Sequence, residues 1–113
     1  MTRDRDGGTP EPAARRATVR EALREALRRG PATARDLSAE VGVREKDVAD
    51  HLAHLARSLP HRGERLVVQP ASCIACGFAF RSRERLARPG ACPACRSTRI
   101  DPPLFRVEAE PER

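Results

Sequence analysis

The amino-acid sequence predicts an α+β fold, with three helices in the first half and short antiparallel strands in the second. Apolar residues recur every three or four positions between residues 14 and 59, which is the period of an amphipathic helix. After Pro60 that period disappears, and short runs typical of strands alternate with glycines and prolines. Four cysteines in two C-x2-C pairs lie in this second half. The second half is therefore expected to fold around a bound metal ion.

The first helix is expected over residues 14–29. Its apolar positions fall on one face of a helix and comprise Val19, Ala22, Leu23, Ala26 and Leu27. Gly30 and Pro31 follow, and they end the helix because glycine suits a left-handed cap and proline cannot continue a helix.

Two further helices follow on either side of a short break. Thr33 offers an N-cap hydroxyl to a helix over residues 34–40. The break at Gly42 precedes a third helix over residues 44–58, which Pro60 closes. A short helix, a tight corner and a longer helix make a helix-turn-helix, and a strand over residues 66–69 supplies the start of a wing.

The cysteines predict a metal centre. Cys73 and Cys76 are followed, after fifteen residues, by Cys92 and Cys95, a spacing typical of a four-cysteine zinc site. Disulfides, a redox C-x-x-C and iron are the alternatives for these four thiols. Four protein ligands leave no open coordination position, which favours a structural zinc ion. The strands around the site, near residues 78–80, 98–100 and 104–107, predict a rubredoxin-like zinc ribbon of short antiparallel strands.

These patterns divide the chain into four parts. Residues 1–12 are expected to form a disordered N-terminal segment, because they contain too few apolar residues to fold. Residues 13–69 form the winged helix-turn-helix, residues 70–107 the zinc ribbon and residues 108–113 an acidic tail. Because zinc supplies folding free energy to a ribbon with few apolar residues, chelation is expected to unfold residues 65–107 while the helices persist in part.

Candidate DNA contacts lie on the third helix, at the turn before the wing and in the ribbon. The formal net charge is +6, and most of this excess lies in residues 61–106. The first residues of a recognition helix lie nearest the base edges of the major groove. Arginines at alternate positions of an extended segment lie on one face and can grip phosphates. The candidates are Arg44, Lys46, Asp47, His51, Arg57, Arg62, Arg81, Arg83 and Arg85.

Several functional classes are disfavoured. No stretch is long and apolar enough to span a bilayer, and residues 1–12 contain no apolar segment of a signal peptide, so a cytoplasmic protein without a membrane partner is expected. Neither paired carboxylates nor an activated nucleophile can be recognised, so no enzyme is expected. Helix-turn-helix proteins commonly bind paired half-sites, which makes a homodimer a further expectation.

The sequence resembles predicted prokaryotic transcriptional regulators that fuse a winged helix-turn-helix to a C-terminal zinc ribbon. The resemblance covers residues 15–107 and is most specific in the ribbon. The residues that carry it are 47–59, 73–83, 88–89, 92–97, Ile100 and 103–105. It implies a transcription-associated, DNA-binding role and a structural zinc ion.

Two functions follow from the sequence. The first is a DNA-binding transcriptional regulator with a structural four-cysteine zinc ribbon, whose partner is double-stranded DNA. The second is a non-enzymatic adaptor that docks on the transcription machinery or another protein complex. The third helix favours the adaptor, because its basic and acidic side chains cancel and a neutral helix gains little from phosphate contacts.

Overall fold

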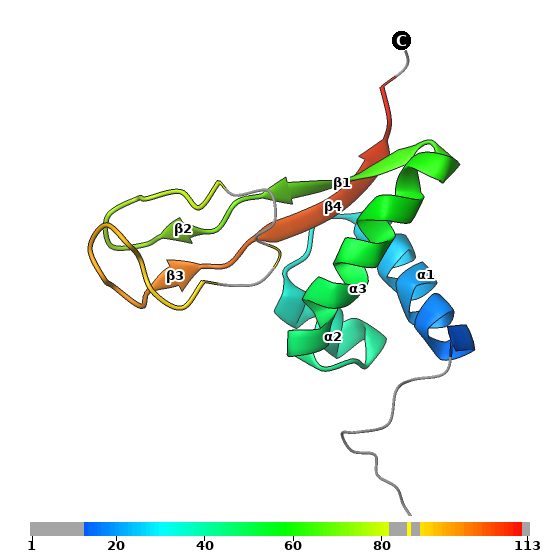
Figure 1. The fold of residues 1–113 in the computed structure, drawn as a ribbon, viewed down its shortest axis with the longest axis horizontal. Coiled ribbons are helices and arrows are strands. Elements are labelled where there is room, and N and C mark those ends of the chain that lie inside the picture. Colours follow the sequence, from blue (N-terminus) through cyan, green and yellow to red (C-terminus); the bar gives the residue numbers. More distant parts are fainter. Residues whose placement is uncertain (1–12, 82–85, 87–88, 112–113) are drawn as a thin grey trace, which may run out of the picture.

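The computed structural model describes residues 13–81, 86 and 89–111. Within them, three helices pack against a two-stranded sheet, and an arm with a second, smaller sheet extends from it (Figure 1). The helices are α1 (Ala13–Arg29), α2 (Ala34–Val41) and α3 (Glu45–Ser58), followed by the 3-10 helix η1 (Leu59–Arg62). The strands are β1 (Glu64–Gln69), β2 (Ser72–Cys73), β3 (Ile100–Asp101) and β4 (Leu104–Ala109).

The helix boundaries follow the predicted signals. At the start of α2 the Thr33 hydroxyl accepts a hydrogen bond from the Asp36 backbone N–H, and the Asp36 carboxylate accepts one from the Thr33 N–H. At its end Gly42 adopts φ 84°, a left-handed conformation that few other residues tolerate. The predicted α2–α3 corner is therefore confirmed.

The larger sheet joins segments that lie far apart in the sequence. β1 pairs antiparallel with β4, in a register that places Glu64 opposite Ala109 and Gln69 opposite Leu104. Ala32, between α1 and α2, adds a bridge to Phe105 through two backbone hydrogen bonds of 2.9 Å. The β1–β4 pair thus occupies the place of the wing that the sequence predicts, and residues 70–103 separate its two strands in the sequence.

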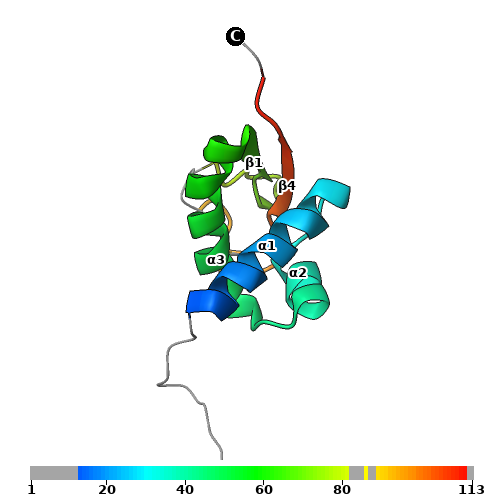
Figure 2. The same ribbon diagram turned by 90° about the vertical axis from the view of Figure 1, so that its right-hand side faces the viewer.

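The position of β4 differs from the sequence interpretation, which grouped residues 104–107 with the zinc ribbon and residues 108–109 with the tail. Phe105 is fully buried among side chains of the three helices, and Val107 belongs to the same core. Figure 2 shows the β1–β4 pair beside the three helices. The physical reason is the period of β4: Phe105 and Val107 alternate with exposed Arg106, so one face of the strand completes the helical core.

One buried ion pair braces this core. Glu64, at the start of β1, accepts hydrogen bonds of 2.6 and 3.1 Å from the Arg24 guanidinium of α1. Arg28 lies 3.2 Å from the same carboxylate. The hydrogen bond from Arg24 lowers the pKa of Glu64 below its ordinary value, although burial opposes the shift. Glu64 is therefore held as a carboxylate.

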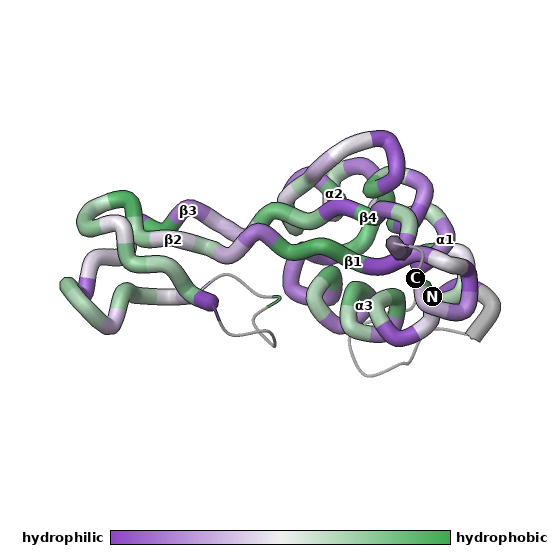
Figure 3. The backbone as a smooth tube through the Cα atoms, turned by 90° about the horizontal axis from the view of Figure 1, so that it is seen from above, coloured by the Kyte–Doolittle hydropathy of each residue, from purple (hydrophilic) through white to green (hydrophobic). Residues whose placement is uncertain are grey.

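The arm has a small core of its own. Ala71, Phe80 and Ile100 are buried there with Cys73 and Cys92, and the core lies around the β2–β3 pair. Ser72 also bridges to Ala79, and the predicted strand over residues 78–80 is hydrogen-bonded to residues 71–73 on both sides of this bridge. Figure 3 shows this arm extending away from the helices, with hydrophobic residues along adjoining parts of β1 and β4.

Among the described residues, no helix is both long enough and apolar enough to cross a membrane.

Candidate functional site

Two similar turns carry the cysteines. In the first, the Cys73 N–H donates to the Phe78 carbonyl at 2.8 Å, and the Gly77 N–H donates to the Cys73 carbonyl at 2.8 Å. In the second, the Cys92 N–H donates to the Ser97 carbonyl at 2.9 Å, and the Arg96 N–H to the Cys92 carbonyl at 2.7 Å. The two C-x2-C segments are therefore equivalent knuckles.

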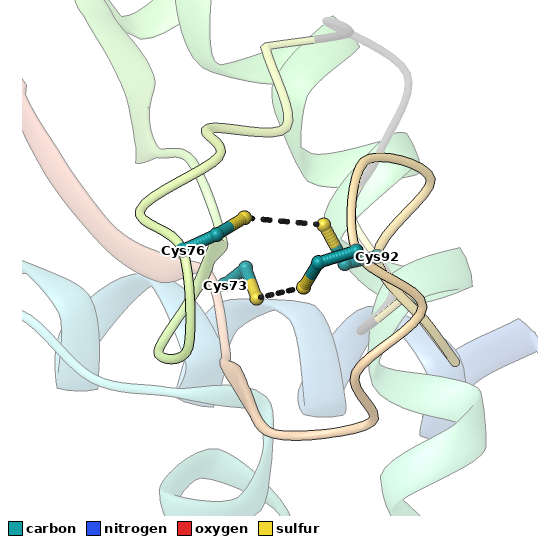
Figure 4. Close-up of side chains that lie close together, drawn as sticks. Cys73, Cys76 and Cys92 are labelled. Atoms are coloured by element: carbon teal, nitrogen blue, oxygen red, sulfur yellow. Dashed lines mark hydrogen bonds between the residues drawn. The ribbon is translucent and has the colours of Figure 1, made fainter.

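The four sulfurs converge between these knuckles. All four lie within 4.8 Å of one another. The Sγ atoms of Cys73 and Cys95 are 3.6 Å apart, and those of Cys76 and Cys92 are 3.7 Å apart. Figure 4 shows Cys73 and Cys76 on one side of this gap and Cys92 on the other. The cysteines that the sequence selected can together hold a metal ion.

These distances fit a tetrahedral site. Sulfurs about 2.3 Å from one zinc ion stand about 3.8 Å apart, close to the two measured contacts. A disulfide would bring two sulfurs to about 2.05 Å, and all four cysteines are free. Two of the thiols are buried and two are exposed, so the site lies at the surface of the arm with its inner half in the arm's core.

The thiols differ in acidity. Burial opposes ionisation of Cys73, but backbone N–H groups in its knuckle and the neighbouring thiols lower its pKa to about 7. Cys76 accepts a hydrogen bond from the Phe78 backbone that favours its thiolate, yet burial and the sulfur of Cys92 raise its pKa to about 12. Thiolates crowded together repel one another, so a cation at their centre must displace protons as it binds.

On the helical part of the chain, the predicted contact residues lie in different settings. Arg44 is the exposed N-cap of α3, and its Nε lies 2.9 Å from the Asp47 carboxylate. Lys46 is exposed on the first turn of α3. Arg57 is exposed at the far end of α3, 3.0 Å from His54 Nδ1.

The remaining predicted arginines lie off this helix. Arg62 is paired with Glu21 of α1 at 2.7 Å. Arg81 is exposed and directly follows Phe80 in the arm. Arg83 and Arg85 lie outside the described residues.

His51 corrects the sequence interpretation, which placed it on the outward face of the third helix. Its side chain is only 5% exposed. It follows Val48 by three residues and precedes Leu55 by four, which puts it at the edge of the apolar face of α3. That spacing was visible in the sequence, and the burial of the side chain contradicts the outward placement of His51.

A hollow that sequence reasoning missed lies between helices α2 and α3 and the base of the arm. Its volume is about 520 Å³. Arg35 of α2 and Lys46 of α3 are its basic side chains, and Glu45 is its acidic one. Leu86, Pro102 and Pro103 also line it. In the described part of the chain neither cation has a carboxylate partner. The sequence analysis took its candidates from the third helix, the turn before the wing and the ribbon, and Arg35 lies in the first turn of α2 instead.

Comparisons with known proteins support this architecture. Residues 18–67 match a family model described as PF0610-like, N-terminal, which covers most of α1, all of α2 and α3, and part of β1. The solution NMR structure of protein PF0610 from Pyrococcus furiosus is similar over 97% of this chain and 99% of that chain, with a TM-score of 0.70 and 26% sequence identity. The similarity therefore extends over both the helices and the arm. No curated protein matches the chain.

Proposed function

We propose that this chain is a DNA-binding transcriptional regulator. Helices α2 and α3 bind duplex DNA, with the N-terminal part of α3 in the major groove. A zinc ion bound by Cys73, Cys76, Cys92 and Cys95 orders the arm that extends the β1–β4 wing. The zinc is structural, because four thiolates fill its coordination sphere, and the protein is a binding protein rather than an enzyme.

One observation carries the DNA proposal: among the described residues, both cations that line the helix-turn-helix hollow lack a carboxylate partner, although Glu45 lines it too. Most described arginines of the helical part form ion pairs within the protein, namely Arg24, Arg28, Arg29, Arg44, Arg62, Arg65 and Arg106. Arg35 and Lys46 instead face one hollow from the first turns of two adjacent helices. Helix N-termini favour anions, so phosphate oxygens suit this position.

The test measures how DNA affinity depends on salt. Zinc-loaded protein selects duplexes from a random pool, and the best duplex is then titrated at several salt concentrations. Each phosphate neutralised contributes about 0.9 to the slope of log K against log salt. The double variant Arg35→Ala with Lys46→Ala should flatten the slope by about 2. Arg28→Ala removes a cation that is already paired with Glu64, and it is the matched control. A double variant with the wild-type slope would refute this interface.

We propose zinc rather than iron, because four thiolates fill the coordination sphere and the role proposed for the ion is to order the arm. Elemental analysis of protein purified without added metal should find about one zinc per chain. Replacement by cobalt should give the intense thiolate-to-metal absorption of a tetrahedral four-sulfur site. Iron in stoichiometric amount in the same preparation would contradict this assignment.

A protein-interaction adaptor is the second candidate, and the charge of α3 favours it. Arg44, Lys46 and Arg57 are balanced by Glu45, Asp47 and Asp50 on the same helix. A neutral helix can pack on a protein partner without the desolvation of unpaired charge. If the random pool yields no preferred sequence and the salt slope is near zero, the adaptor replaces the regulator.

A further inference from the structure

The arm also contains an apolar groove beside the metal centre, and Cys92 is the one metal-binding cysteine that lines it. The groove has a volume of about 520 Å³. Phe78 and Phe80 form one side of it, with ring centroids 5.1 Å apart in an edge-to-face arrangement. Ala91 and Pro93, around the second knuckle, also line it. Phe78 remains 38% exposed, and it is one of two large apolar side chains that the described residues leave at the surface.

Two arginines also line this groove, Arg81 after the first knuckle and Arg96 after the second. Both are exposed. Within residues 13–81, 86 and 89–111, neither guanidinium has a carboxylate partner. An apolar groove with unneutralised positive charge at its edge is complementary to a ligand that is apolar and acidic.

The backbone of Arg96 gives an independent indication. It has φ 66°, and it is the one described non-glycine residue with positive φ. Its counterpart in the first knuckle is Gly77, with φ 82° and the same hydrogen bond from its N–H to the carbonyl of the first cysteine of the pair. Glycine fits this left-handed position without strain, whereas arginine does not. Backbone strain of this kind is found at binding sites, where the function of the side chain outweighs the energetic cost of the strained conformation.

We propose that this groove binds an extended acidic peptide segment of a partner protein, with an apolar side chain of the peptide packed on Phe78 and its carboxylates on Arg81 and Arg96. Arginine binds carboxylates in a bidentate geometry, and aromatic residues and arginines are enriched where proteins meet. A single-stranded nucleic acid is less suited, because Phe80 is 7% exposed and offers little ring face on which a base can stack. This inference does not depend on DNA binding by α3, since the two surfaces use different residues.

The test is a fluorescence-anisotropy titration of the full-length, zinc-loaded protein with the labelled decapeptide DELPDELPDE. We expect micromolar affinity for this peptide and at least about tenfold weaker binding for KKLPKKLPKK, which has the opposite charge, and for DEGGDEGGDE, which lacks apolar side chains. Absence of binding by the acidic apolar peptide would overturn the proposal. Stronger binding of a short oligothymidylate in the same assay would also overturn it and assign the groove to nucleic acid.

Arg96→Gly separates binding from folding. Because glycine relieves the backbone strain, this variant should release cobalt or zinc at the same temperature as the wild type or a higher one. It should nevertheless bind the acidic peptide at least about tenfold more weakly, and Phe78→Ala should do the same. Arg99→Ala removes an exposed arginine outside the groove and should bind normally.

Each other result bears on the proposal. Wild-type peptide affinity in Arg96→Gly, or earlier metal release by that variant, would overturn the role given to Arg96. An equal loss of affinity in Arg99→Ala would show that general charge, rather than the groove, binds the peptide. DNA affinity should be unchanged in Arg96→Gly, so failure of the peptide proposal and failure of the regulator proposal are distinguishable.

Discussion

Phe105 should stabilise the helices even though it follows the whole metal-binding arm in the sequence. Its side chain is fully buried in the helical core. Burying a phenylalanine removes about 150 Å² or more from water, which at about 25 cal/mol per Å² amounts to about 4 kcal/mol. Phe105→Ala should therefore lower the free energy of unfolding by about 3–5 kcal/mol, the range typical of this change in a core. For a domain of this size, that loss lowers the melting temperature by at least about 12 °C.

The assay is urea and thermal unfolding of zinc-loaded protein, followed by circular dichroism at a wavelength where helices dominate. Arg106→Ala is the matched control, since Arg106 is exposed on the other face of β4 and should change the midpoint little. If Phe105→Ala left helix unfolding unchanged, β4 would not belong to the helical core. The arm would then be a C-terminal appendage rather than an insertion in the wing.

Three other perturbations test the metal-binding arm, the buried carboxylate and the helix corner. Chelation should remove hydrogen-exchange protection from residues 72–81 and 89–101 but not from Leu66 or Phe105. Loss of protection at Phe105 as well would support the wider unfolding that the sequence suggested. The pKa of Glu64 is lowered, so its carboxylate stabilises the fold above its ordinary pKa, and this contribution disappears as the pH falls through the lowered value. In urea titrations, Glu64→Gln should therefore lose less stability than the wild type between about pH 5 and pH 3. Gly42→Ala forces a side chain into a left-handed cap and should cost about 1 kcal/mol in the same urea assay, whereas no change would place the corner elsewhere.

The local features of this fold could be read from the sequence because they depend on neighbouring residues. Helix caps are set by a hydroxyl, a glycine or a proline within one turn, and Thr33 and Gly42 indicated the corner correctly. The metal site was equally local: each C-x2-C pair forms its own knuckle, and the spacing between pairs sufficed to bring the sulfurs together.

The partner of β4 could not be predicted in the same way. The alternation of Phe105 and Val107 shows that one face of the strand is buried, but it does not show in which core. Pairing with β1 is decided by the packing of side chains from three helices, which no short segment encodes. Arg96 was also beyond sequence reasoning, since its left-handed backbone became visible only beside its counterpart Gly77.

The place of the arm within the wing has a consequence for how fast the protein folds. β1 and β4 can pair only after the chain between Gln69 and Leu104 closes as a loop. When metal has already joined the knuckles, the β2–β3 pair holds the two ends of that chain together, so the loop still to be closed is only a few residues on each side. A loop about eight times shorter saves three doublings of length, at about 0.6 kcal/mol each. Metal uptake at the tip of the arm should thus accelerate assembly of a helical core that contains none of the metal's ligands, by about one order of magnitude.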